Sequence, residues 1–190
     1  MTKIKICGIT RAEDAELCDA HDVDFLGFIF VPSSPRHVQP EHAARIRTSA
    51  KRVGVFRDES AETIRRIVDQ VDLDFVQLHG SESDDDIAAI DLPVIKAFRV
   101  GTRLPDITSN ADWLMFDSGG GTGRTFDWSL LAGYPRAKPF FLAGGLTPDN
   151  VAEAIRVVRP DAIDVSSGVE LAPGVKDPDK VRRLIERVRA

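Results

Sequence analysis

Hydrophobic and polar positions alternate along the chain in a regular pattern of short apolar runs and longer amphipathic segments. The short runs are rich in β-branched residues, and several carry almost no polar residue, which is typical of parallel strands covered on both faces. Eight runs predict strands: Lys3–Cys7, Phe25–Phe30, Arg52–Phe56, Phe75–His79, Val94–Phe98, Trp113–Asp117, Phe140–Ala143 and Ala162–Val165.

The segments between these runs repeat apolar positions at helical spacing, so the predicted order is strand, loop, helix throughout. Pro40, Pro148 and Pro178 suit the first turn of a helix, where the missing N–H removes no intrahelical hydrogen bond. The predicted helices are Ala12–His21, Pro40–Ala50, Ala61–Val71, Asp84–Ile90, Pro148–Val158 and Pro178–Arg189, with a short one at Asp127–Ala132.

One connection lacks the helical pattern. Gly101, Pro105 and Asn110 interrupt the segment between Phe98 and Asp112, which predicts that the helix after the fifth strand is missing or replaced by a loop. Without this helix, one side of the fifth and sixth strands is expected to be exposed. One missing helix still permits a closed barrel.

The alternation of strands and helices predicts a parallel sheet. We expect residues 1–190 to form one α/β domain, a compact single-domain (β/α)8 TIM barrel. Such barrels usually have about 250 residues, so a chain of 190 residues is short for the fold. The alternative is an open doubly wound sheet. No G-x-G-x-x-G turn follows the first strand, and the glycine-rich turns come late, so the barrel is favoured.

The composition narrows the classes of partner. Hydrophobic residues make up 43% and charged residues 29%, as in ordinary folded domains. A net charge of −5, with no basic cluster among aromatics, argues against nucleic-acid binding. No apolar stretch is long enough for a signal peptide or membrane span, so we expect a cytoplasmic protein with no membrane partner and with Cys7 and Cys18 as free thiols. Both a monomer and a homodimer fit the sequence.

Two late turns are candidates for binding a phosphate. In a β/α barrel the loops after the strands form the active face. Gly144-Gly145 follows the seventh strand and Ser166-Ser167-Gly168 follows the eighth, where free N–H groups and hydroxyls can surround an anion. Either turn alone is equally well explained as a simple tight turn, in which glycine provides the positive φ angle that the backbone needs. The pair in this register favours phosphate binding, a recurring feature of such barrels.

A thiol and a carboxylate are the candidate catalytic groups. Free cysteine is most often a small buried hydrophobe, but Cys7 ends the first strand and can face the barrel mouth as a base. Asp127 follows the glycine-rich segment 119–123, predicted to be a mobile loop that closes over substrate. Asp127 suits a helix N-cap equally well. One base and one acid suit the isomerisation of a phosphorylated sugar derivative without a cofactor.

Two further polar residues lie at the predicted active face, one in a loop and one at a strand end. Arg36, in the loop after the second strand, is either a solvated charge or a clamp for a substrate carboxylate. His79 is either a substrate-binding residue or a structural histidine. The four histidines show no zinc-ligand spacing, so no metal is predicted.

With these residues placed, the sequence resembles the phosphoribosylanthranilate isomerase family of tryptophan biosynthesis. The resemblance covers nearly the whole chain, and its motifs together are highly specific. They are Lys5-Ile6-Cys7-Gly8-Ile9-Thr10, Gly27-Phe28-Ile29-Phe30, Ser33-Ser34-Pro35-Arg36, Val53-Gly54-Val55-Phe56, Val76-Gln77-Leu78-His79-Gly80, Gly123-Arg124-Thr125-Phe126-Asp127-Trp128, Ala143-Gly144-Gly145-Leu146-Thr147-Pro148 and Asp164-Val165-Ser166-Ser167-Gly168-Val169-Glu170.

The resemblance implies an Amadori rearrangement of N-(5-phosphoribosyl)anthranilate, with no cofactor. It implies that Cys7 is the base that removes the proton at ribose C2 and that Asp127 is the acid that protonates the ring oxygen. Arg36 matches the arginine that holds the anthranilate carboxylate, and Asp164 is expected to assist polar contacts. The implied phosphate-binding residues are Gly144, Gly145, Ser166, Ser167 and Gly168.

The chain departs from the family pattern in its short segment between Phe98 and Asp112 and at Ala143, where a small hydroxyl residue also occurs. Two rival functions stay open. One is a histidine-pathway aminoaldose isomerase, which uses aspartates at the ends of the first and fifth strands, near which Cys7 and Phe98 stand here. The other is a phosphate-ligand-binding barrel without turnover.

Overall fold

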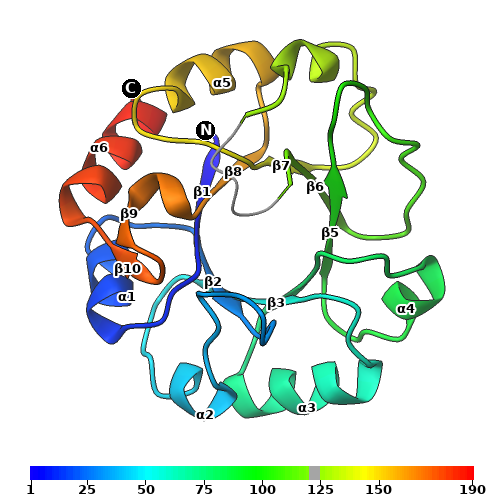
Figure 1. Cartoon of the computed structure of the whole chain (residues 1–190), viewed down its shortest axis with the longest axis vertical. Helices are drawn as coiled ribbons and strands as arrows, with labels where there is room; N and C mark the ends of the chain where they lie inside the picture. Colours follow the sequence, from blue (N-terminus) through cyan, green and yellow to red (C-terminus); the bar gives the residue numbers. More distant parts are fainter. Residues whose placement is uncertain (120–124) are drawn as a thin grey trace.

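The computed structural model describes residues 1–119 and 125–190, and its centre is a closed barrel of eight parallel strands (Figure 1). Consecutive strands are neighbours, and the last strand pairs with the first, with Lys5 opposite Asp164. The barrel prediction is therefore confirmed. The strands are β1 Lys3–Cys7, β2 Phe25–Ile29, β3 Lys51–Phe56, β4 Phe75–Leu78, β5 Val94–Arg99, β6 Trp113–Asp117, β7 Phe140–Leu142 and β8 Ala162–Val165.

Helices surround the barrel (Figure 1). In α3, Ser60 caps the helix by accepting a hydrogen bond from the Thr63 N–H, and Ile64, Ile67 and Val71 form its buried stripe, so the predicted bounds are those found. The helices are α1 Ala12–Asp19, α2 Pro40–Ala43, α3 Ala61–Val71, α4 Asp84–Ala88, α5 Val151–Val158 and α6 Pro178–Arg189, with a 3₁₀ turn, η1, at Trp128–Leu131.

Two predicted helices differ from the structure by three residues or more at one end. The predicted helix Pro40–Ala50 ends at Ala43. The Arg52 guanidinium donates hydrogen bonds to the carbonyls of Ala43 and Ile46, at 2.8 and 2.7 Å, and so replaces the N–H donors that a further helical turn would supply. The helix predicted from Pro148 begins only at Val151. Before it, the Asn150 side chain accepts from the Thr147 N–H at 2.8 Å, which holds Pro148 in a turn.

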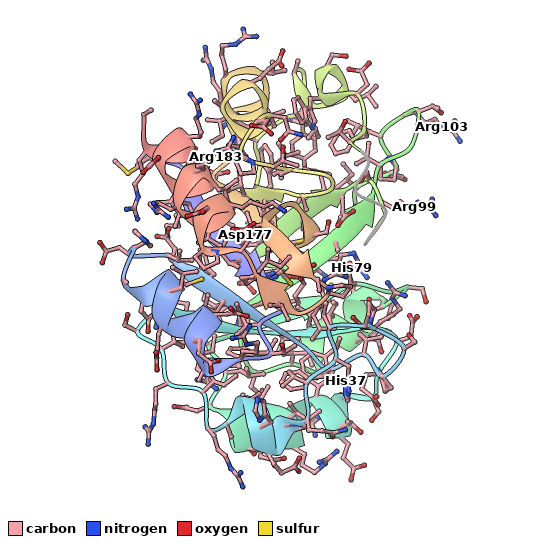
Figure 2. The ribbon with its side chains drawn as sticks, turned by 60° about the vertical axis from the view of Figure 1, so that its left-hand side comes forward. His37, His79, Arg99, Arg103, Asp177 and Arg183 are labelled. Atoms are coloured by element: carbon pink, nitrogen blue, oxygen red, sulfur yellow. The ribbon has the colours of Figure 1, made fainter. Side chains whose placement is uncertain are left out.

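The connection between β5 and β6 contains no helix, as predicted. The expected exposure of these strands was wrong, because Leu104 and Ile107 of the loop pack against the core and leave Leu114 and Phe116 buried. Figure 2 shows Arg99 at the end of β5, with its side chain at the outer edge of the molecule.

The barrel interior is apolar at one end and polar at the other. At the apolar end Phe25 packs edge-on against Phe75 and Phe141, and Trp113 lies 5.1 Å from Phe141 between ring centroids. Lys5, Cys7 and Asp164 come later along their strands and so lie nearer the carboxyl-terminal end. The aromatic layer fills the amino-terminal end of the barrel, and the polar residues lie toward the carboxyl-terminal end, where the active face of such barrels is found.

A small hairpin that the sequence did not predict lies between β8 and α6 (Figure 1). After a 3₁₀ turn, η2 Ser167–Val169, the chain forms β9 Glu170–Ala172 and the antiparallel β10 Val175–Lys176. Within the part of the chain that the structure describes, no helix is long and apolar enough to cross a membrane.

Candidate active site

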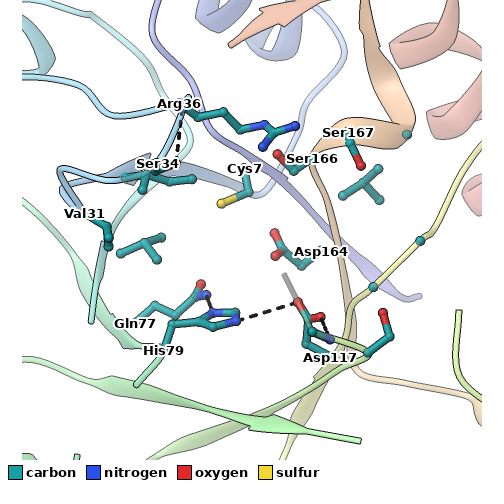
Figure 3. A pocket seen from close by; sticks show the side chains of 18 of the residues that line it. Cys7, Val31, Ser34, Arg36, Gln77, His79, Asp117, Asp164, Ser166 and Ser167 are labelled. Atoms are coloured by element: carbon teal, nitrogen blue, oxygen red, sulfur yellow. Dashed lines mark hydrogen bonds and ion pairs between the residues drawn. The ribbon is translucent and has the colours of Figure 1, made fainter. Parts of the chain in front are cut away.

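A pocket of about 310 Å³ opens at the carboxyl-terminal end of the strands (Figure 3). All the site residues expected from the sequence, except Asp127, line it. They are Cys7, Arg36, His79, Gly144, Gly145, Asp164, Ser166, Ser167 and Gly168. Residues from both halves of the chain are therefore brought to one cavity at the predicted face of the barrel.

Cys7 is held against the neighbouring strand, and its side chain is almost fully buried. It stands opposite Gly27 on β2, where a Cβ atom would lie only 2.7 Å from the Cys7 Sγ and 3.0 Å from the Lys5 Nζ. Gly27 thus leaves space for both groups. Burial raises the pKa of the Cys7 thiol, while the positive charges of Lys5 and Lys176 act in the opposite direction.

A buried ion pair lies beside Cys7. The Lys5 Nζ is 2.9 Å from an Asp164 carboxylate oxygen, and no part of the lysine side chain is exposed. Burial by itself would lower the pKa of Lys5, but the charges of Asp164 and Cys7 outweigh it and raise the pKa. Lys5 is therefore a fixed positive charge next to the thiol. Sequence reasoning missed it, although a lysine between Ile4 and Ile6 in an apolar strand was a visible signal.

Arg36 lies on the side of the pocket formed by the loop after β2. Its Nε and Nη2 atoms donate to the Glu170 carboxylate at 2.9 and 2.7 Å in a bidentate ion pair. Both side chains of this pair are largely buried. The hydrogen bonds to Glu170 raise the pKa of Arg36. The guanidinium is thus a fixed group at the pocket wall rather than a solvated surface charge.

The two late turns have the backbone expected of an anion cradle. Gly144 and Gly145 adopt φ angles of +87° and +65°, which residues other than glycine rarely adopt. At Gly168 a Cβ atom would collide with the Leu146 carbonyl oxygen. The Ser166 hydroxyl is buried and has no hydrogen-bond partner among the described residues, so it can donate to a ligand.

His79 and Asp117 form a third polar group in the pocket (Figure 3). The Gln77 amide is 2.9 Å from the His79 Nδ1, and the His79 Nε2 is 3.8 Å from the Asp117 carboxylate. Burial lowers the pKa of His79 and raises the pKa of Asp117, with the His79 charge opposing the second shift. The other Asp117 oxygen accepts from the Gly119 N–H at 2.6 Å. Asp117 was not among the predicted site residues, although it ends β6.

Asp127 lies outside the set of described residues that line the pocket. Its exposed carboxylate caps η1 and accepts a hydrogen bond from the Ser129 N–H at 3.0 Å. The Ser129 side chain and this N–H together lower the pKa of Asp127. The N-cap position that the sequence allowed is thus the one found. Most of the predicted 119–123 loop, from residue 120 onward, lies outside the described residues.

Known proteins of one family match this chain over nearly its whole length. The model of the family described as N-(5'phosphoribosyl)anthranilate (PRA) isomerase matches residues 4–187. The N-(5'-phosphoribosyl)anthranilate isomerase of Chromohalobacter salexigens is 47% identical over 201 residues, covering 98% of this chain and 94% of that protein. The chain belongs to the N-(5'-phosphoribosyl)anthranilate isomerase family.

Solved structures of this family share the fold over the full length. The phosphoribosyl anthranilate isomerase from Thermus thermophilus superimposes with a TM-score of 0.91 at 38% identity, covering 99% of this chain and 98% of that one. A second family structure, in complex with reduced 1-(o-carboxyphenylamino)-1-deoxyribulose 5-phosphate, gives a TM-score of 0.87 at 39% identity, covering 100% of this chain and 99% of that one. The chain is thus an isomerase of tryptophan biosynthesis.

The pocket's chemistry suits proton transfer. It combines a thiol, two carboxylates, a histidine and two arginines with the glycine turns, and the Lys5 ammonium pairs with one of the carboxylates from outside the lining. Among residues 1–119 and 125–190, no group of three or more histidine, cysteine or acidic side chains has the arrangement needed to hold a metal ion.

Proposed function

We propose that this chain converts N-(5-phosphoribosyl)anthranilate into 1-(2-carboxyphenylamino)-1-deoxyribulose 5-phosphate by an Amadori rearrangement. The observation that carries the proposal is one pocket that joins Cys7 to the Ser166–Gly168 turn on one side and to Arg36 on another. A substrate with a phosphate at one end and an aromatic carboxylate at the other fits these groups. The family structure bound to the reduced product supports this choice of substrate.

In the proposed reaction Asp127 donates a proton to the ribose ring oxygen, and the C1–O bond breaks to give an open-chain iminium ion. Cys7 then removes the proton from C2. The electrons of the broken C2–H bond form the C1=C2 double bond, and the electrons of the C=N π bond return to the nitrogen as a lone pair. The resulting enol ketonises, taking a proton at C1 and losing one from the C2 hydroxyl. Atoms and electrons balance without an oxidant or reductant, so paired acid and base catalysis suffices.

Lys5 supplies the positive charge that a cysteine base needs. A buried thiol resists ionisation, and an adjacent cation lowers that cost. Asp164 holds the Lys5 ammonium at 2.9 Å, and the pair's position beneath the pocket keeps solvent away from it. Lys5 and Asp164 therefore set how much thiolate is present when substrate binds.

Asp127 must change its surroundings to act as the acid. As an exposed N-cap its carboxyl has a lowered pKa, so it carries no proton at neutral pH. We propose that it leaves the cap in the substrate complex and becomes buried, which raises its pKa and supplies the proton. Asp117, already in the pocket with a raised pKa, is the rival for this role.

The test is a fluorescence assay that follows the loss of phosphoribosylanthranilate, run beside an assay with the related histidine-pathway aminoaldose. We expect turnover of the first substrate alone, because neither Cys7 nor Phe98 supplies the two aspartates that the second reaction uses. Turnover of only the histidine intermediate would overturn the assignment. Tight phosphate-ligand binding with no turnover of either substrate would identify a silent binding protein.

A further inference from the structure

The hairpin of β9 and β10 carries a carboxylate that no catalytic step uses. Glu170 is 7% exposed, and its carboxylate accepts hydrogen bonds from Arg36, from the Lys176 Nζ at 2.9 Å and from the Gly174 N–H at 3.2 Å. Two buried cations therefore share one anion. Such a fully hydrogen-bonded group fixes the direction of each partner.

Lys176 connects this carboxylate to the end of β1. Its Nζ, fully buried, donates to the Cys7 carbonyl at 2.6 Å as well as to Glu170. The hairpin itself is fastened to the segment after β1, since the Thr10 hydroxyl donates to the Gly174 carbonyl at 2.6 Å and the Lys176 N–H to Asp14 at 3.2 Å. A continuous set of hydrogen bonds thus runs from the Arg36 guanidinium to the backbone of Cys7.

We propose that Glu170 is a positioning residue, which with Lys176 holds the Arg36 guanidinium at a fixed place relative to Cys7. This proposal rests on the proposed function, in which Arg36 binds the substrate's aromatic carboxylate. Glu170 occupies the Nε and Nη2 edge of the guanidinium, which leaves the Nη1 donors for that carboxylate. The orientation of the clamp is then set before substrate arrives, so less conformational freedom is lost on binding.

A merely structural role would act differently from a positioning role. Either role lowers thermal stability, because Glu170→Gln removes the charge that pairs with the buried Lys176, but loss of Glu170 as a fold element would also weaken every ligand. Loss of Glu170 as a positioning group would weaken only ligands that carry the aromatic carboxylate, and only while Arg36 is present. Inorganic phosphate, which meets the turns after β7 and β8, serves as the ligand without that carboxylate.

The experiment is a double-mutant cycle of Glu170→Gln and Arg36→Ala, with Glu186→Gln on the exposed face of α6 as the matched control. The readouts are KM and kcat, the inhibition constant of the reduced product, the Kd of inorganic phosphate, and Tm. For Glu170→Gln we expect KM and the inhibition constant to rise about tenfold, with phosphate Kd unchanged. In the Arg36→Ala background we expect Glu170→Gln to add no further loss.

Additive losses in the double variant, or an equal loss of phosphate affinity, would overturn the positioning role. Should Glu170→Gln fail to fold, Glu170→Asp keeps the charge and shortens the side chain by one methylene, and the same pattern of losses is expected in smaller measure. If Arg36→Ala weakens the reduced product while both Glu170 variants leave it unchanged, this inference alone fails. If Arg36→Ala has no effect on the reduced product, the carboxylate clamp of the proposed function fails as well.

Discussion

The two sides of the barrel mouth are organised differently. On the paired side, formed by Lys5, Arg36, Asp164, Glu170 and Lys176, every one of these buried charges has an opposite partner within 2.9 Å. On the open side, formed by β5, β6 and the chain that follows them, no helix covers the connection between the two strands.

Carboxylates show the same contrast. On the open side Asp117 lies 3.8 Å from a histidine and accepts a hydrogen bond from the Gly119 N–H, and Asp127 is exposed to solvent as a helix cap. The paired side holds Cys7 and Arg36, the proposed base and carboxylate clamp, in fixed positions, whereas Asp127, the proposed acid, lies outside the pocket. Preorganisation is therefore concentrated on the side that carries Cys7.

The largest effect is expected from breaking the paired side at Lys5. Lys5→Met leaves the Asp164 carboxylate buried without a partner, which should lower the free energy of unfolding by about 3–5 kcal/mol. The double variant Lys5→Met/Asp164→Leu should recover most of that stability, because no charge is left unpaired, yet fail to recover turnover. Chemical denaturation and kcat check this. Wild-type stability in Lys5→Met would show that the pair has no role in stability, and wild-type turnover in the double variant would show that it has no role in catalysis.

The open side is tested next by Asp127→Asn. Asparagine caps a helix as well as aspartate does, so thermal stability should not change. The loss of the proton donor should lower kcat by at least about 10²-fold, with the affinity for inorganic phosphate retained. Asp106→Asn, an exposed change on the same side, is the control. If Asp117→Asn removes turnover and Asp127→Asn does not, the acid is Asp117.

A smaller effect is expected at the phosphate turn. The Ser166 hydroxyl has no partner among the described residues, so Ser166→Ala should change stability by less than about 0.5 kcal/mol. One lost hydrogen bond to the ligand, worth about 1 kcal/mol, should raise KM and the Kd of inorganic phosphate about fivefold. Isothermal titration with phosphate measures the second value. A variant that binds phosphate as tightly as the wild type would remove Ser166 from the cradle.

The smallest effect concerns the stability of the open side and its dependence on pH. Because burial raises the pKa of Asp117, the folded state holds that proton longer than the unfolded state, and stability is lost as pH rises through the raised pKa. Asp117→Asn should therefore raise Tm at pH 7 by about 2–4 °C. The gain should vanish at a pH below the ordinary aspartate range, where both states are protonated. Thermal scans from about pH 2 to about pH 8, which extend from below the ordinary aspartate pKa to well above it, check this, and a constant difference would contradict it.

The sequence predicted the barrel, but of the paired side it predicted only Arg36 and Asp164 as site residues. Apolar runs fix strands such as Lys3–Cys7 and Trp113–Asp117, because parallel strands are buried on both faces whatever the loops do. Cys7 and Arg36 could be placed at the mouth once the strand ends were known. Their partners could not, since Glu170 lies 134 residues from Arg36 and only the closed fold brings them together.

Local signals also failed where side chains override propensity. The helix from Pro40 stops at Ala43 because a guanidinium from β3 takes its free carbonyls, and the sequence of the helix itself carries no trace of this. The apolar run around Lys5 predicts a strand but not the ion pair, because the partner Asp164 comes from β8. The family motif assigns Asp127 as the acid, but the structure places it as a cap, so the proposed acid role requires a rearrangement that the sequence does not describe.

The most direct test of the central claim, that Cys7 is the base, is the rate of phosphoribosylanthranilate loss catalysed by Cys7→Ser, measured by fluorescence beside the wild type. Binding of the reduced product is measured on the same samples. The hydroxyl of serine is far too weak an acid to replace the thiolate, so kcat should fall by at least about 10²-fold while the product analogue binds as in the wild type. A near-wild-type rate in Cys7→Ser would contradict the assignment of the base.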